Sequence, residues 1–216
     1  MTEHSFIGER VPRVDALEKV TGEADYCADL KIPGMLFGKI KRSPYPFARI
    51  LSIDTSSAQK LPGVRAVITA QDVTQFAYGL VLLDELPLAS DYVRYIGDEV
   101  AAVAAVDEDT AEEALDLIRV EYEELTPVFD PEKAVEPGAP AIHPELEGVK
   151  HNVAHHINFV RGDGDSAFKR ADFVIGDRFS TQGVHQAYLE TQGCIAQWDV
   201  SGKLTMWGST QSPFYH

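Results

Sequence analysis

The sequence predicts a mixed α/β (α+β) protein in which two blocks of strands and short helices are joined by a proline-rich stretch. Three observations support this fold class: a strand–helix–strand pattern at residues 99–125, a cluster of prolines at residues 126–149, and two strands joined by a turn at residues 194–207. The 216-residue chain is 44% hydrophobic and 25% charged, which is the composition of a folded globular protein.

The strand–helix–strand pattern is the clearest local signal. Residues 100–106 are a continuous run of alanine and valine, which predicts a strand covered on both faces. Acidic residues at 107–109 favour the start of a helix, and Thr110 with Glu113 predicts a capping box there. Alternation of polar and apolar residues resumes at residues 120–122, where a second strand is expected.

Further elements are predicted on either side of this unit. Residues 1–35 show no periodicity and are expected to be irregular. Short helices are expected at residues 56–61 and 167–171, the second capped by Asp163 and Asp165. The expected strands are residues 36–42, 48–53, 64–69, 152–159, 173–179, 194–198 and 203–207.

The prolines predict how the chain divides into domains. Five prolines and two glycines between residues 126 and 149 leave little room for regular structure. We therefore predict a first domain at residues 1–127, a linker at 128–150, and a second domain beginning at 151–216. Because nothing closes off the strands of the second block, we expect the chain to be the front part of a longer protein, or one piece of a split one.

Charge and composition exclude several classes of function. The formal net charge of −15 opposes binding to nucleic acid, which relies on clustered lysine and arginine. No apolar run approaches the roughly 20 residues of a membrane span, and the N-terminus lacks a secretion signal. These features predict a cytoplasmic protein, although one exported by a signal-bearing partner subunit would look the same. Cys27 and Cys194 are too few for a disulfide scaffold or a four-thiolate metal site.

Three histidines, His151, His155 and His156, are the first candidate metal ligands. On a helix, the i, i+4 pair would match a zinc-binding helix, but no glutamate follows the first histidine. The segment is also expected to be extended, so exposed strand residues are the favoured interpretation. The sequence lacks a G-x-S-x-G nucleophile elbow, a phosphate-binding loop and a dinucleotide-binding glycine motif.

A polar cluster near the C-terminal end is the better candidate site. Residues 183–192 contain His185, Glu190 and several amides among apolar strands, and residues 207–213 contain Gln211. Amide and hydroxyl groups at a strand end can donate hydrogen bonds to an oxo or carbonyl group without adding charge. The alternative is a polar loop that only caps a sheet.

Short motifs occur in a characteristic order along the chain. They are RVD at 13–15, KVTG at 19–22, ADY at 24–26, RSP at 42–44, ARI at 48–50, PGV at 62–64, YIGDEVA at 95–101 and VEYE at 120–123. Together they resemble the large, molybdopterin-binding subunit of the xanthine dehydrogenase and aldehyde oxidase family. The resemblance implies an α/β hammerhead domain in the first block, followed by the beginning of a molybdenum-cofactor-binding domain at residues 151–216.

The same resemblance suggests site residues. Residues 209–211 match the segment whose glutamine, in this family, donates a hydrogen bond to the apical oxo ligand of molybdenum, so that role is assigned to Gln211. His185 and Glu190 are supporting candidates without an assigned role. No residue of this chain is expected to ligate the metal directly or to be catalytic, because the family's general-base glutamate is expected beyond residue 216.

The resemblance also implies the cofactors, the partners and the reaction. It implies a molybdenum–molybdopterin cofactor, with iron–sulfur centres and FAD on partner domains or subunits. The partners would be an iron–sulfur subunit, a flavin subunit and the remainder of the large subunit. The complete enzyme would hydroxylate an aldehyde or N-heterocycle carbon of a small-molecule substrate with oxygen from water, passing electrons to the iron–sulfur centres. The chain alone is expected to be inactive.

Two alternatives remain open from the sequence alone. The chain could be a truncated, non-catalytic binding or assembly module that docks the iron–sulfur subunit, or an unrelated acidic α/β protein.

Overall fold

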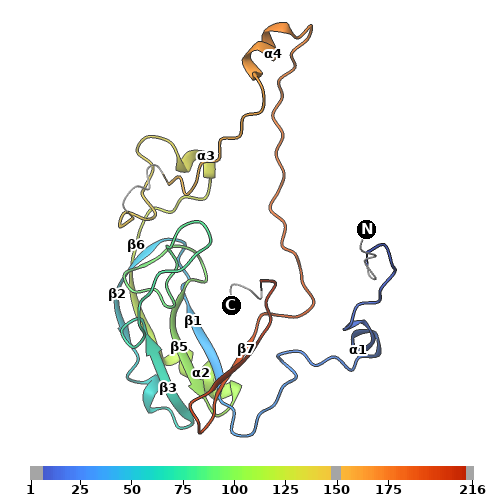
Figure 1. The fold of residues 1–216 in the computed structure, drawn as a ribbon. Coiled ribbons are helices and arrows are strands. Elements are labelled where there is room, and N and C mark those ends of the chain that lie inside the picture. Colours follow the sequence, from blue (N-terminus) through green and yellow to red (C-terminus); the bar gives the residue numbers. More distant parts are fainter. Residues whose placement is uncertain (1–6, 147–151, 213–216) are drawn as a thin grey trace. The chain divides into compact units, whose positions relative to one another are not determined.

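The computed structural model describes residues 7–146 and 152–212 of the chain (Figure 1). It divides into two compact units, one of residues 34–174 and another formed by residues 1–33 together with 175–216. Each unit is described by itself below. None of the described helices is long and apolar enough to cross a membrane.

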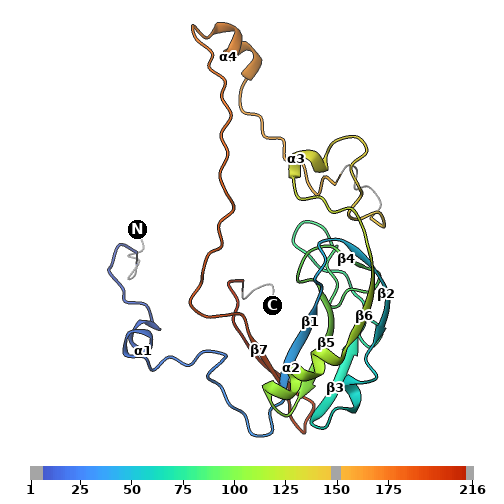
Figure 2. The same ribbon diagram turned by 180° about the vertical axis from the view of Figure 1, so that it is seen from behind.

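The larger unit contains a first antiparallel sheet with the strand order β1-β5-β3. The helix α2 and the 3-10 turn η1 contact this sheet, and Figure 2 shows α2 against β5. The bounds are β1 Phe37–Arg42, β5 Glu99–Ala105, β3 Val64–Thr69, α2 Glu108–Leu117 and η1 Ala58–Lys60. Small apolar residues fill the space between them; they are Ala58, Val67, Ala101, Val103, Ala114 and Ile118.

A second antiparallel sheet in the same unit has the order β4-β2-β6. Its strands are β4 Tyr92–Val93, β2 Ala48–Asp54 and β6 Arg119–Glu124. Its core contains Ala48, Val93 and also Val100, which lies on β5 of the first sheet. β5 therefore contributes to both cores, which confirms the strand covered on both faces. The connection β5–α2–β6 joins the two sheets.

The start of α2 differs from the prediction. The side chain of Asp107, in extended conformation, accepts a hydrogen bond of 2.7 Å from the Thr110 backbone N–H, so Asp107 is the N-cap. The prediction of a capping box formed by Thr110 and Glu113 is wrong. Thr110 lies inside the helix, three residues after the N-cap. A carboxylate at this position also interacts favourably with the helix dipole.

Two segments contain short helices that periodicity does not predict, and the expectation that residues 1–35 are irregular is wrong. Residues 1–35 contain α1 (Ala16–Thr21), whose end is capped by Gly22 in the left-handed conformation, with φ 78°. The proline-rich stretch contains α3 (Pro131–Ala134), because Asp130 caps it and Pro131 occupies a first-turn position that needs no N–H donor. Local capping thus forms helices where periodicity offered no signal.

Two expected strands are absent from the described residues. Residues 152–159 and 173–179 are neither helix nor strand, and their large apolar side chains, such as Phe159 and Phe173, are exposed. Within the described part of the chain no neighbouring strand pairs with them, so their backbone groups gain no ladder hydrogen bonds. A helix forms between them, but it begins three residues earlier than predicted: α4 spans Gly164–Arg170. Asp163 is its N-cap, and Asp165 lies in the first turn rather than at the cap.

The smaller unit contains one hairpin of β7 (Cys194–Trp198) and β8 (Leu204–Gly208). The strands pair antiparallel with Ile195 opposite Trp207. The first strand matches its predicted bounds, and the second is shifted by one residue. This hairpin positions the candidate site.

Candidate cofactor-binding site

The hairpin turn fixes where β8 begins. Asp199 Oδ1 accepts hydrogen bonds from the backbone N–H groups of Ser201 at 2.8 Å and Lys203 at 3.0 Å. Gly202 adopts a left-handed φ of 84°, which a residue with a side chain would rarely adopt. These bonds also hold the pKa of the Asp199 carboxyl below its usual value, the side-chain bond from Ser201 being the largest cause.

Ser209 ties the residues after β8 to the residues before β7. Its backbone N–H donates to the Gly193 carbonyl at 3.1 Å, which extends the ladder by one step. Its hydroxyl accepts from the Gly193 N–H at 2.9 Å and donates to the Thr191 carbonyl at 3.2 Å. A single serine thus anchors the polar segment 183–192 at one end of the hairpin.

Gln211 lies in a bend three residues beyond the last residue of β8. The bend is stabilised by the Ser212 N–H, which donates to the Thr210 hydroxyl at 3.1 Å. The Gln211 side chain is exposed, and its amide has no hydrogen-bond partner among residues 7–146 and 152–212. It is therefore an available donor and acceptor at the end of a hydrogen-bonded hairpin.

Glu190 is half-buried and bonds to a distant part of the same unit. Its Oε1 accepts a hydrogen bond of 3.2 Å from the backbone N–H of Cys27. The Cys27 thiol in turn lies 3.8 Å from the carbonyl oxygen of Trp207, within reach of a weak S–H···O bond. Glu190 therefore joins the N-terminal segment to the hairpin, a role that no sequence pattern indicates.

His185 contacts only its own segment among the described residues. Its Nδ1 accepts a 3.0 Å hydrogen bond from the Ala187 N–H, and its ring lies 5.5 Å from the Tyr188 ring. An accepting Nδ1 carries no proton, so the ring is the Nε2–H tautomer. Ala187 has a left-handed φ of 51°, which a non-glycine residue adopts at some cost and which this local bond helps to maintain.

The structure thus places two of the three predicted residues, Glu190 and Gln211, close in sequence to the hydrogen bond between Ser209 and Thr191. Glu190 adjoins Thr191, whose carbonyl accepts from Ser209, and Gln211 follows Ser209 by two residues. His185 is not joined to this link by any described contact. Of the candidate metal ligands, His155 and His156 are exposed and His151 lies outside the described residues. No group of three or more histidine, cysteine or acidic side chains suited to a metal occurs in the described part of the chain.

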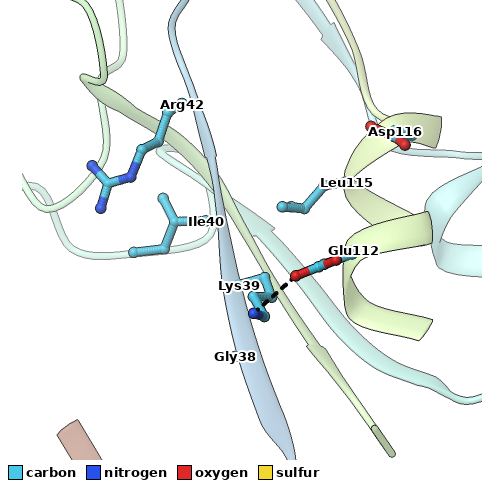
Figure 3. A pocket seen from close by; sticks show the side chains of 7 residues that line it. All are labelled: Gly38, Lys39, Ile40, Arg42, Glu112, Leu115 and Asp116. Atoms are coloured by element: carbon cyan, nitrogen blue, oxygen red, sulfur yellow. Dashed lines mark ion pairs between the residues drawn. The ribbon is translucent and has the colours of Figure 1, made fainter. Parts of the chain in front are cut away.

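A separate hollow of about 580 Å³ lies between β1 and α2 of the larger unit (Figure 3). Its charged groups are largely paired: Lys39 Nζ lies 3.0 Å from Glu108 and 3.1 Å from Glu112. These bonds, chiefly that to Glu108, raise the pKa of Lys39. None of the residues predicted from sequence as a site lines this hollow.

Comparison with known protein families assigns the two blocks. Residues 21–126 match the family model for the aldehyde oxidase and xanthine dehydrogenase a/b hammerhead domain, and residues 143–216 match that for the molybdopterin cofactor-binding domain. The chain belongs to the aldehyde oxidase and xanthine dehydrogenase family. It contains the hammerhead domain and the start of the cofactor-binding domain, as the order of the sequence motifs implies.

Curated relatives agree with this family. A probable xanthine dehydrogenase subunit from Bacillus subtilis is 42% identical over 92% of this chain, and the nicotinate dehydrogenase large molybdopterin subunit of Eubacterium barkeri is 39% identical over 99%. The chain spans 26% of the first relative and 49% of the second.

Solved structures agree as well. The chain resembles the Cu,Mo-CO dehydrogenase with a TM-score of 0.82 and 37% identity, covering 96% of this chain and 28% of that one. It resembles quinoline 2-oxidoreductase from Pseudomonas putida 86 with a TM-score of 0.80 and 35% identity, covering 93% and 26%.

The chemistry of the described residues fits the molybdopterin cofactor that the second family model names. A carboxamide without a partner is a neutral hydrogen-bond donor, suited to an oxo group on a metal held by other ligands. Gln211 supplies such a carboxamide among the described residues.

Proposed function

We propose that this chain is the N-terminal part of the large subunit of a molybdenum hydroxylase. In the complete enzyme, an aldehyde or N-heterocycle carbon would be hydroxylated with oxygen from water, and electrons would pass to iron–sulfur centres. The supporting observation is the exposed Gln211 amide beyond the end of a hairpin, which has no hydrogen-bond partner among residues 7–146 and 152–212, in a chain that matches both family models in order. When bound, molybdenum–molybdopterin supplies the oxygen-transfer and redox chemistry.

The chain's own residues have positioning roles in this proposal. The Gln211 amide would donate a hydrogen bond to the oxo group of the cofactor, and Ser209 holds the segment on which Gln211 lies. Glu190 fixes the N-terminal segment against the same hairpin. His185 shapes the preceding loop through its bond with Ala187. The domain division that we propose is a hammerhead domain at residues 1–127, a linker at 128–150 and an incomplete cofactor-binding domain at 151–216.

The partners proposed for the complete protein follow from its relatives. Relatives are named as large subunits, and one is named as subunit gamma of the 6-hydroxypseudooxynicotine dehydrogenase complex. We therefore propose assembly with an iron–sulfur subunit and a flavin subunit, in the cytoplasm. The 216-residue chain by itself should contain no stoichiometric molybdenum and should show no turnover, which elemental analysis and assay of the purified chain would test.

A chimera tests the role of Gln211. The chain would replace the matching quarter of the Bacillus subtilis relative, and the assembled complex would be assayed for molybdenum content and dehydrogenase turnover. We expect an active chimera in which Gln211→Ala lowers turnover by about 10- to 100-fold, as loss of an outer hydrogen bond to a metal centre commonly does.

Gln197 on β7 of the same hairpin is the matched control, because it is also an exposed amide. Gln197→Ala should leave turnover and molybdenum content unchanged. Equal effects of the two substitutions, or a molybdenum-loaded chimera without activity, would overturn the proposal.

A further inference from the structure

His143 lies between two carboxylates that belong to different segments of the larger unit. Its Nδ1 is 3.0 Å from Glu145 Oε1, and its Nε2 is 3.5 Å from Asp84 Oδ2. Glu145 belongs to the connector, which we define as residues 128–146, and Asp84 belongs to the loop of residues 78–85. Only one-fifth of the His143 side chain is exposed.

The loop that carries Asp84 is closed by two backbone hydrogen bonds. The Tyr78 and Glu85 N–H groups each donate to the other residue's carbonyl, at 2.9 and 3.0 Å. Gly79 has a φ of 143°, and a Cβ there would lie 2.0 Å from the Leu82 carbonyl oxygen, so the turn requires glycine. Leu80, Val81 and Leu83 are exposed at its tip. With few buried contacts of its own, this loop depends on contacts such as that to His143.

The connector is also held by contacts that do not depend on pH near neutrality. Arg94 Nη2 forms a 2.6 Å ion pair with Glu145, and Arg94 Nε donates to the Ile142 carbonyl at 3.2 Å. The Asn152 amide accepts from the Ile142 N–H and donates to the Ala134 and Pro140 carbonyls, at 2.9 to 3.0 Å. Connector attachment therefore persists whatever the charge on His143.

The charged groups around His143 come from three segments. The loop contributes Asp84 and Glu85, and the connector contributes Glu145. The turn between β4 and β5, with the start of β5, contributes Arg94, Tyr95, Asp98 and Glu99, which line the same cavity of about 380 Å³ as His143. Burial raises the pKa of Asp98, and Tyr95 donates a 2.9 Å hydrogen bond to Glu99.

The geometry makes the two contacts of His143 depend on its protonation. A neutral imidazole has one N–H and can donate to one carboxylate only, facing the other with a lone pair. A protonated imidazole has two N–H groups and a positive charge, so it can donate to Glu145 and attract the Asp84 carboxylate at the same time. Histidine is the side chain that changes between these forms near physiological pH.

We propose that His143 forms a pH-dependent link between the connector and the loop of residues 78–85. When its ring is protonated, it holds the loop through Asp84; when the ring is neutral, it keeps its hydrogen bond to Glu145 and releases the loop. The loop borders the cavity described above, so its release changes access to that cavity. This inference does not depend on the proposed function, because all its groups lie in the larger unit.

Hydrogen exchange of the Tyr78 and Glu85 amides reports directly on the loop. Protection factors, which correct for the intrinsic pH dependence of exchange, would be measured on the full chain at about pH 5.5 and about pH 8, on either side of histidine titration. In the wild type, protection should be about 5-fold greater at the lower pH, the size expected for a partly exposed ion pair. His143→Gln should remove this dependence, and His143→Lys should keep protection high at both values.

Two further variants make the test decisive. Asp84→Asn removes the loop's partner and should abolish the pH dependence in a chain that retains His143. His156→Gln, at an exposed histidine outside the cavity, should behave as the wild type. Equal wild-type protection at both pH values would overturn the proposal. An unchanged pH dependence in His143→Gln would overturn it as well and would assign the dependence to the carboxylates instead.

Discussion

The backbone N–H of Cys27 donates a 3.2 Å hydrogen bond to the Glu190 carboxylate, 163 positions later in the chain. Beside this bond, a Cβ placed on Gly193 would lie 3.7 Å from Cys27 Cβ and 3.5 Å from its sulfur. The N-terminal segment is therefore seated against the start of β7 within the smaller unit. The sequence singled out Glu190 as a candidate site residue, but no local pattern indicates that Cys27 is its partner.

Gly193→Cys should form a disulfide with Cys27. The Cβ–Cβ distance of 3.7 Å falls within the roughly 3.5–4.5 Å range of protein disulfides, and Gly193 has no left-handed φ that would oppose a side chain. Mild oxidation should lower the intact mass by two hydrogens, and peptide mapping should join residues 27 and 193.

The same substitution in a Cys27→Ser background provides the control, because it leaves Cys194 as the competing thiol. A bridge between residues 193 and 194, or failure to oxidise with Cys27 present, would contradict the seating of the N-terminal segment.

Asn152→Ala should destabilise the connector. The change removes three hydrogen bonds to backbone groups, and leaving such groups unpaired costs about 1–3 kcal/mol. Asn152 also has a left-handed φ of 56°, which alanine adopts less readily than asparagine. Chemical denaturation of the full chain should show a lower free energy of unfolding.

Asn152→Gly separates the two causes, because glycine accepts the backbone conformation but supplies no amide. Its stability should fall between those of the wild type and Asn152→Ala. Wild-type stability for the glycine variant would mean that the three hydrogen bonds contribute nothing.

Asp107→Ala should lower the thermal midpoint of the larger unit, because it removes the N-cap of α2. The hydrogen bonds from Thr110 lower the pKa of Asp107 below its ordinary value of 3.8. The stabilisation by the charged form is therefore fully present above that value and is lost as the pH falls through the lowered folded-state pKa.

Asp107→Asn keeps a capping oxygen but cannot titrate. Near neutral pH, the thermal midpoint of Asp107→Asn should therefore lie close to that of the wild type. As the pH is lowered through the acid range, its midpoint should fall less than the wild-type midpoint does. Identical acid dependence in wild type and Asp107→Asn would show that other carboxyls control it.

Local pattern was sufficient for most elements of the larger unit. The run at residues 100–106 predicted β5, alternation predicted β1 and β6, and short strand-like segments predicted β2 and β3, all to within one or two residues. Periodicity failed where pairing decides the outcome. Residues 152–159 and 173–179 have strand-like composition but no partner strand in the described chain, so they remain extended without a ladder.

For the candidate site, the sequence pointed to His185, Glu190 and Gln211 but not to their contacts. The polar groups were placed at a strand end, whereas β8 stops at Gly208 and the Gln211 amide lies in a bend three residues beyond it. The Ser209 link to Thr191 and Gly193 was not foreseen, because a serine hydroxyl shows no pattern until its partners are brought beside it.

The sequence by itself determined the family, the order of the two blocks and most of the strands, because these depend on hydrophobic periodicity and short motifs that are local in the chain. Only the tertiary structure decided that β5 serves two cores, that Cys27 meets Glu190, and that His143 lies between Asp84 and Glu145. Such contacts join residues far apart in sequence, and their formation depends on the packing of whole elements rather than on any local preference.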